Sequence, residues 1–312
     1  QCIGAQQLLL FRFHSTVPPR SCDRMAQQQV QATCPEHDDA EMFEVRSERY
    51  AAANAAILDA FNNAFEICDD QSAQQFIDVG CGPGNFTFKH LLPRLPPCRR
   101  LVAADCSDNM LKFAAKKYPH KKIEYLPLDI MGDVDKFVRE QGQFQRVYSF
   151  FMLQWVRDQR QAMQNFRKLI APGGEFFTVL LTTSYFYDLF EVMLGHPHWA
   201  NYREAIENFL PAITGARDVR VLRKYARDLV EMADLIPLAC EAFAYPPTKR
   251  TKDELIRNLL SFNPVYPLLN GEEKEELRTF VTEYTEKIWA DTQEGKDMDR
   301  KVVVVHAQKP FD

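Results

Sequence analysis

The chain has 312 residues, of which 46% are hydrophobic and 26% charged, as in a globular protein with a substantial core. The 38 Lys and Arg residues against 43 Asp and Glu give a formal net charge of −5. This balance argues against an extended basic surface, so we expect no nucleic-acid binding. No apolar run approaches the roughly 20 residues that cross a bilayer, so we expect no integral membrane association.

The eight cysteines lack the spacing of a metal site or of a disulfide scaffold. No CxxC pair occurs, and no group of Cys and His residues has zinc-ligand spacing. We therefore expect no metal site, reduced thiols throughout and a cytoplasmic location.

The first 24 residues show neither helix nor strand periodicity. The apolar run LLLF at residues 8–11 is too short for a signal-peptide core and has no charged residue before it. We expect Met25 to be the natural start and residues 1–45 to be a disordered or non-native extension. Three arginines among residues 1–24, with no acid before Asp23, leave a mitochondrial transit segment as the alternative.

From Ser47 onward the sequence alternates between helical and extended patterns. Apolar residues spaced by three and four from Tyr50 to Phe65 predict a first helix. Short apolar runs predict strands at residues 75–79, 100–104, 122–128, 146–151 and 175–181. Helical patterns between them predict helices at residues 85–92, 107–117 and 160–170. This alternation predicts an α/β fold whose parallel sheet is covered on both faces.

The second half of the chain is mostly helical and carries the last strands. Residues 185–236 are expected to be helical, with breaks at Pro197, Pro211 and Gly215. Strands are expected at residues 238–245 and 301–308, and helices at 252–260 and 272–289. We therefore expect one domain over residues 46–312, with helical insertions at about 185–236 and 250–293 that cap the substrate.

A glycine-rich turn follows the first expected strand. Glycines stand at 80, 82 and 84, where they allow positive φ and a close approach of the backbone to a ligand. A dinucleotide-binding turn has its glycines at the first, third and sixth positions, so the third glycine here comes one residue early. Asp78 would lie awkwardly beside a pyrophosphate but suits an ammonium or sulfonium group. These two features disfavour a nicotinamide oxidoreductase, and an ordinary strand-to-helix turn is the structural alternative.

Residues 78–84 resemble the first motif of class I S-adenosylmethionine-dependent methyltransferases, D-x-G-x-G-x-G. The resemblance implies a Rossmann-like sheet, mostly parallel with an antiparallel last strand, carrying helical insertions. It also implies S-adenosyl-L-methionine as the cofactor. On this basis the cofactor is expected to contact Asp78, Gly80, Cys81, Gly82 and Gly84.

Two later strands also end in acids. Asp105 ends the second strand, where a carboxylate can accept hydrogen bonds from both ribose hydroxyls. Its alternative role is a helix-capping acid before Ser107. In the methyltransferase family an acid after the third strand receives the adenine amino group, which implies that role for Asp129, with Ile130 packed on the base. The alternative for Asp129 is ordinary turn chemistry.

Three further residues are expected beside the cofactor. Cys106 directly follows Asp105, and Met110 belongs to a segment that resembles the family's hydrophobic shelf under the adenine. Phe151 lies at the carboxyl end of the fourth strand, which faces the sulfonium in this fold.

The segment 151–159 reads F-x-L-x-W-x-R-D-Q and resembles the juvenile hormone acid O-methyltransferases, which esterify farnesoic acid or juvenile hormone acid. The likeness extends from about Tyr50 to Lys309. It implies a small hydrophobic carboxylic acid as substrate, with Trp155 donating its indole N–H and Gln154 its amide to the carboxylate. The alternatives are a core aromatic for Trp155 and a surface amide for Gln154.

Two departures from that family leave the exact acid open. Gln154 stands where the family often has His or Asn, and Ile57 stands about where insect members carry a Gln. A carboxyl group with a pKa of about 4 to 5 is ionised at neutral pH and needs no general base. A methyltransferase for another acceptor, such as a phenol or amine, and a non-catalytic protein that binds S-adenosylmethionine remain as alternatives.

Overall fold

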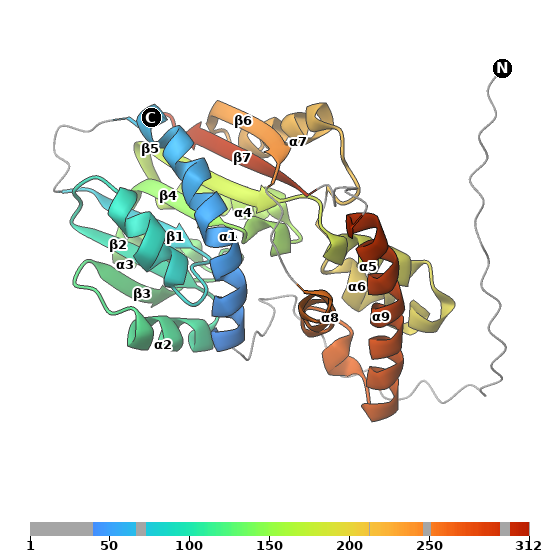
Figure 1. Ribbon diagram of the computed structural model, residues 1–312. Helices are drawn as coiled ribbons and strands as arrows, with labels where there is room; N and C mark the ends of the chain where they lie inside the picture. The colour runs from blue at the N-terminus through green and yellow to red at the C-terminus, as the bar shows by residue number, and fades with distance from the viewer. Residues whose placement is uncertain (1–39, 67–72, 212, 246–250, 294–299, 312) are drawn as a thin grey trace, which may run out of the picture. The chain divides into compact units, whose positions relative to one another are not determined.

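The computed structural model describes residues 40–66, 73–211, 213–245, 251–293 and 300–311. Within them, seven strands form a sheet in the order β3-β2-β1-β4-β5-β7-β6 (Figure 1). The strands are β1 (Gln75–Val79), β2 (Arg100–Asp105), β3 (Ile123–Pro127), β4 (Phe144–Phe150), β5 (Ile170–Leu181), β6 (Ile236–Ala244) and β7 (Lys301–Gln308).

Most neighbouring strands run parallel. β1 pairs in parallel with both β2 and β4, whereas β7 is antiparallel to its neighbours β5 and β6. The expected sheet, mostly parallel with an antiparallel last strand, is therefore confirmed. Because parallel strands end at the same edge, the segments that follow β1, β2 and β4 lie together there.

Helices cover both faces of the sheet. The α-helices are α1 (Ala40–Phe61), α2 (Asp108–Lys117), α3 (Val134–Gln141), α4 (Gln159–Leu169), α5 (Tyr185–Leu194), α6 (Arg203–Glu207), α7 (Val219–Glu231), α8 (Lys252–Ser261) and α9 (Gly271–Gln293). The shorter helical turns are η1 (Asn62–Ala64), η2 (Thr87–Leu91), η3 (Leu92–Arg94), η4 (Leu153–Trp155), η5 (Pro197–Tyr202) and η6 (Tyr266–Leu268).

Successive residues of the central strands point to opposite faces and enter two separate apolar cores. Phe76 of β1 packs with α1 and η2, while the next residue, Ile77, packs with α3 and α4. In β5, Phe177 and Phe176 divide in the same way, and all four side chains are fully buried. Burial on both faces explains why these strands are almost continuously apolar.

The helical insertion divides between two locations. α5, α8 and α9 share the apolar core that also contains α1, whereas α7 packs against the other face of the sheet beside β6 (Figure 1). The prediction of mostly helical structure over 185–236 is confirmed, but α7 covers the sheet itself.

Two sequence predictions need correction. The first helix begins at Ala40 and not at Ser47, so residues 40–45 are helical although they were assigned to the extension. α3 was not predicted, although Asp133 caps it by accepting a hydrogen bond from Lys136 N. Residues 1–39, with the expected extension and start at Met25, lie outside the described residues.

The thiols differ from expectation at one position. Cys106 is disulfide-bonded, so the prediction that all cysteines are reduced is wrong there. Cys81, Cys98 and Cys240 are free thiols. None of the helices in the described residues has the length and apolar character to cross a membrane.

A buried polar cluster joins three strands on the face that α1 covers. Glu175 Oε1 lies 2.9 Å from His306 Nε2, and Glu175 Oε2 accepts a hydrogen bond of 3.2 Å from Glu66 N. Arg146 completes the cluster, with Nε 3.8 Å from Glu175 and Nη2 donating to Glu66 O. The carboxylate therefore compensates a buried guanidinium and holds the chain that follows α1 onto the sheet.

We expect Glu175→Ala to lower the free energy of unfolding by about 3 to 5 kcal/mol, because it leaves the Arg146 charge buried without its partner. Urea unfolding measures the loss. Glu241→Ala is the matched control, since Glu241 is a partly exposed strand glutamate that pairs with Arg223, and it should cost at most about 1 kcal/mol. Equal losses in the two variants would contradict this account of the cluster.

Candidate functional site

The glycine-rich loop after β1 has the backbone conformation that its sequence predicts. Gly80, Gly82 and Gly84 have φ angles of 80°, 55° and 78°, in the left-handed region that favours glycine. Gly80 N and Cys81 N both donate to Ala104 O, at 2.8 and 3.0 Å. The loop is therefore fixed against the end of β2.

Close packing also requires glycine at two of these positions. A Cβ atom on Gly80 would lie 2.3 Å from Met152 Cγ, and one on Gly84 would lie 2.8 Å from the Ala114 side chain. A Cβ on Gly82 would meet the Phe43 ring of α1 at 3.4 Å. α1 therefore lies directly beside the middle of the loop.

Asp105 reaches from the end of β2 onto this loop. Its Oδ2 accepts a hydrogen bond from Gly82 N and its Oδ1 accepts one from Ser107 N, both at 2.9 Å. Each carboxylate oxygen has a further lone pair, so both can still accept a hydroxyl hydrogen. Burial raises the pKa of Asp105. The side chain that caps α2 belongs to Ser107, which accepts from Met110 N.

Asp78 is buried at the end of β1, with 2% of its surface exposed. Its Oδ2 accepts a hydrogen bond of 2.6 Å from Thr87 Oγ1. The pKa of Asp78 is raised to about 7, mainly by desolvation; the hydrogen bond from Thr87 opposes this increase, and the nearby Asp105 adds to it. No Lys, Arg or His in the described part of the chain pairs with it. A buried carboxylate of this kind suits a ligand that brings its own positive charge.

The residues expected around the adenine lie after β2 and β3. Asp129 follows β3, and its Oδ1 accepts a hydrogen bond of 2.8 Å from Met131 N, which is turn chemistry. Ile130 and Met110 are buried, with 5% and 2% of their surfaces exposed. Cys106 is exposed beside Asp105, and its sulfur is engaged in the disulfide. Contact of these residues with adenine stays a prediction.

The carboxyl end of β4 meets α1 and β6 through aromatic rings. Phe151 follows β4 with φ of 53°, which is uncommon for a residue with a side chain. Its ring centroid lies 5.5 Å from that of Tyr50 and 5.4 Å from that of Tyr245. Tyr245 Oη donates to Tyr50 O and Asn54 Oδ1, at 2.9 and 3.1 Å. Tyr245 was not singled out in the sequence because only the fold brings it to this edge.

The two predicted acceptor-binding residues lie together in η4. Gln154 is buried with 4% of its surface exposed, so it is not a surface amide, and its Oε1 accepts from Leu181 N at 3.1 Å. The half-buried Trp155 ring packs edge-on against Tyr187 of α5 and Phe209. Its indole N–H has no hydrogen-bond partner among the described residues. Binding of an acceptor by either residue stays a prediction.

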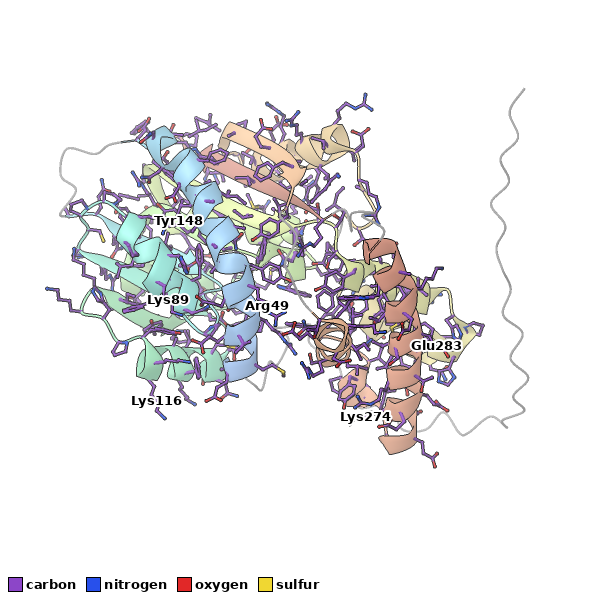
Figure 2. The ribbon with its side chains drawn as sticks, viewed as in Figure 1. Arg49, Lys89, Lys116, Tyr148, Lys274 and Glu283 are labelled. Carbon is purple, nitrogen blue, oxygen red and sulfur yellow. The ribbon has the colours of Figure 1, made fainter. Side chains whose placement is uncertain are left out.

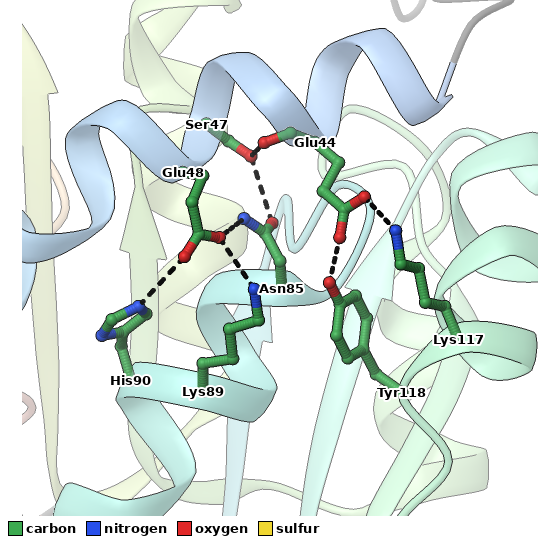
Figure 3. A network of polar contacts seen from close by, with 8 residues as sticks. All are labelled: Glu44, Ser47, Glu48, Asn85, Lys89, His90, Lys117 and Tyr118. Atoms are coloured by element: carbon green, nitrogen blue, oxygen red, sulfur yellow. Dashed lines mark hydrogen bonds and ion pairs between the residues drawn. The ribbon is translucent and has the colours of Figure 1, made fainter.

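A polar network fastens α1 to the helix that follows the glycine loop (Figure 3). Glu48 accepts hydrogen bonds from Asn85 Nδ2 at 2.9 Å and from Lys89 Nζ at 3.1 Å. Burial alone would raise the pKa of Glu48, but these donors hold it below its usual range. Asn85 Oδ1 in turn accepts a hydrogen bond of 3.1 Å from Ser47. The almost fully buried Asn85 is therefore bound to α1 through both the oxygen and the nitrogen of its side-chain amide.

α1 has two further attachments. Glu44 pairs with Lys117 and with Tyr118 Oη at the end of α2 (Figure 3). On the side of α1 toward α8, Arg49 donates to Glu254 Oε1 at 2.9 Å (Figure 2). α1 therefore bridges the glycine loop, α2 and the helical insertion. In the described residues, no group of three or more His, Cys, Asp and Glu side chains is placed to hold a metal ion.

The raised pKa of Asp78 makes a prediction for stability. The unfolded carboxyl ionises near pH 3.8 and the folded one near pH 7, so folding stability falls as pH rises between these values. We expect Asp78→Asn to increase the free energy of unfolding at pH 8, by up to about 4 kcal/mol, and by less at pH 5.

Urea unfolding at both pH values tests this expectation. Asp59→Asn is the control, because the exposed Asp59 has a pKa lowered by Arg94 and should show no such gain. A gain for Asp78→Asn that is independent of pH would contradict the assigned cause.

Known proteins match this chain over the region that contains the glycine loop. Residues 76–174 match the family model described as a methyltransferase domain, which includes the glycine loop, Asp105 and Asp129. Over 203 residues the chain is 26% identical to juvenile hormone acid O-methyltransferase of Drosophila melanogaster, covering 64% of this chain and 67% of that protein. Over 102 residues it is 31% identical to trans-aconitate 2-methyltransferase of Variovorax paradoxus, covering 33% and 36%.

Solved structures support the fold. The structure of a protein assigned as a methyltransferase from Bacillus halodurans matches with a TM-score of 0.50 and 16% identity, covering 83% of this chain and 99% of that one. The glycine loop and the uncompensated acid fit an adenosyl cofactor that carries positive charge. The matched domain, the relatives and the fold together support a class I S-adenosylmethionine-dependent methyltransferase.

Proposed function

We propose that the chain methylates a carboxylate oxygen of a small hydrophobic acid, of the farnesoic acid or juvenile hormone acid type. The observation that carries this proposal is the indole N–H of Trp155, which has no partner among the described residues and lies among aromatic rings at the carboxyl end of β4. Two relatives support the acceptor class, since one is named for juvenile hormone acid and the other for trans-aconitate. Both names denote carboxylic acids.

Different residues around the glycine loop would bind different parts of the cofactor. Asp105 accepts the ribose hydroxyls with the lone pairs that its backbone contacts leave free. Asp78 receives the ammonium of the amino-acid moiety, and Asp129 with Ile130 and Met110 receives the adenine. When bound, S-adenosylmethionine supplies a methyl group that its sulfonium makes electrophilic.

The acceptor requires orientation, not deprotonation. A carboxylate is already ionised at neutral pH, so the protein need not supply a general base. Trp155 donates its indole N–H to one carboxylate oxygen, and Gln154, whose Oε1 is held by Leu181 N, can offer only its Nε2 hydrogens. The rings of Phe151, Tyr50 and Tyr245 exclude water from this edge. Alignment and exclusion of water are then the main contributions of the chain.

A phenol or an amine is a weaker candidate for the acceptor. Such a group has to lose a proton, and the nearby Tyr187 has a pKa raised far above neutrality by burial, which makes it a poor base. A radiolabelled methyl-transfer assay with farnesoic, lauric and aconitic acids and a catechol separates these classes. We expect labelled methyl esters, with farnesoic acid the best acceptor. Methylation of the catechol alone would refute the proposal, and no transfer at all would favour a non-catalytic binding protein.

For the acceptor site, we expect Trp155→Phe to lower kcat/KM for the acid about 10-fold or more, because one hydrogen bond to a charged oxygen is lost. The affinity for S-adenosylhomocysteine should not change. Steady-state kinetics and calorimetry give the two values. Trp289→Phe in α9 is the control, and an equal effect in both variants would argue that Trp155 acts only in packing.

For the cofactor site, we expect Asp105→Ala to weaken S-adenosylhomocysteine binding at least about 10-fold, since two hydroxyls lose a charged acceptor. Calorimetry measures the dissociation constant. Asp108→Ala, which changes an exposed acid in the first turn of α2, should leave it unchanged. Unaltered affinity in the Asp105 variant would remove Asp105 from the cofactor site.

A further inference from the structure

Thr87 is the first residue of η2 and is fully buried beside the end of β1. Its hydroxyl donates a hydrogen bond of 2.6 Å to Asp78 Oδ2, across the nine positions that separate the two residues. The intervening glycine loop turns the chain back so that the start of the helix faces the end of the strand. The short distance is that of a hydroxyl bonded to a charged oxygen.

The surroundings of Asp78 otherwise disfavour its ionised form. In the described residues, the titratable groups that interact electrostatically with it are Asp105, Cys81 and Tyr125. None of these groups is cationic, and each would repel the carboxylate when ionised. Burial acts in the same direction. The Thr87 hydroxyl is the side-chain donor that opposes these effects.

We propose that Thr87 is a positioning residue that keeps the Asp78 carboxylate ionised and turned so that Oδ1 can receive the ammonium of the cofactor. Thr87 occupies Oδ2 alone, which leaves the second oxygen for a ligand. A protonated Asp78 would lose its attraction for an ammonium group. Thr87 acts through Asp78, since its hydroxyl hydrogen is donated to Asp78 Oδ2 and is not available to the cofactor. This inference rests on the proposed role of Asp78 in cofactor binding.

The test compares variants that differ in one hydroxyl. Thr87→Val keeps the approximate shape of the side chain without a donor, and Thr87→Ser keeps the donor. Calorimetry gives the dissociation constant of S-adenosylhomocysteine for each protein between pH 5.5 and 8.5. A second ligand, 5′-methylthioadenosine, lacks the amino-acid moiety and therefore tests the adenosine site alone. Any protonation of the ligand over this pH range affects all variants equally, so it cancels when they are compared.

In the unaltered protein we expect the affinity for S-adenosylhomocysteine to fall as pH decreases through about 7, where Asp78 takes up a proton. Loss of the hydroxyl should raise this midpoint by about one pH unit. Thr87→Val then binds about 10-fold more weakly at pH 6 and about 2-fold more weakly at pH 8. Thr87→Ser should follow the unaltered protein, and binding of 5′-methylthioadenosine should be equal in all of them.

The outcomes separate this inference from the proposal on which it rests. If Asp78→Asn binds S-adenosylhomocysteine as tightly as the unaltered protein, the role of Asp78 in the cofactor site is wrong. If Asp78→Asn binds weakly but Thr87→Val keeps the original midpoint, the role of Thr87 is wrong. Equal weakening of both ligands in Thr87→Val would also overturn it, because that result indicates only altered packing. Thr87→Ala replaces Thr87→Val if the latter does not fold, and the same outcomes then decide.

Discussion

The buried carboxylate of Asp78 is the constraint around which the candidate site is organised. An acid with 2% of its surface exposed and no cationic partner among the described residues is costly to the folded protein. The fold keeps it at the end of β1, next to three glycines with positive φ and opposite the backbone contact of Asp105 with Gly82. The buried Asp78 carboxylate therefore lowers the folding stability of the protein at a position where binding of a positively charged ligand can restore it.

The parallel arrangement of β1, β2 and β4 converts separate sequence segments into this one site. Asp105 ends β2 and bonds the loop after β1, while Phe151 follows β4 and meets α1. α1 closes the arrangement from outside, since Phe43 lies against Gly82 and Glu48 binds Asn85. The helix is thus packed onto the glycine loop as part of the same edge.

Local sequence patterns predicted the sheet and the glycine loop because their physical causes are local. Alternating strands and helices follow from apolar runs, and positive φ at Gly80, Gly82 and Gly84 follows from residue type. The start of α1 was missed because Ala40–Arg46 is held mainly by contacts with residues distant in sequence, such as Glu44 with Tyr118. Tyr245 and the buried state of Gln154 likewise depend on contacts that no sequence window contains.

The position of β7 has a consequence for synthesis of the chain. β7 lies between β5 and β6, although it follows both in sequence. Until residues 301–308 have left the ribosome, β5 and β6 each lack a neighbour on the side that β7 will occupy, and their unpaired backbone groups are open to other extended chains. The sheet is therefore completed only after translation of these residues, and a nascent chain without them is exposed to misassembly at that gap.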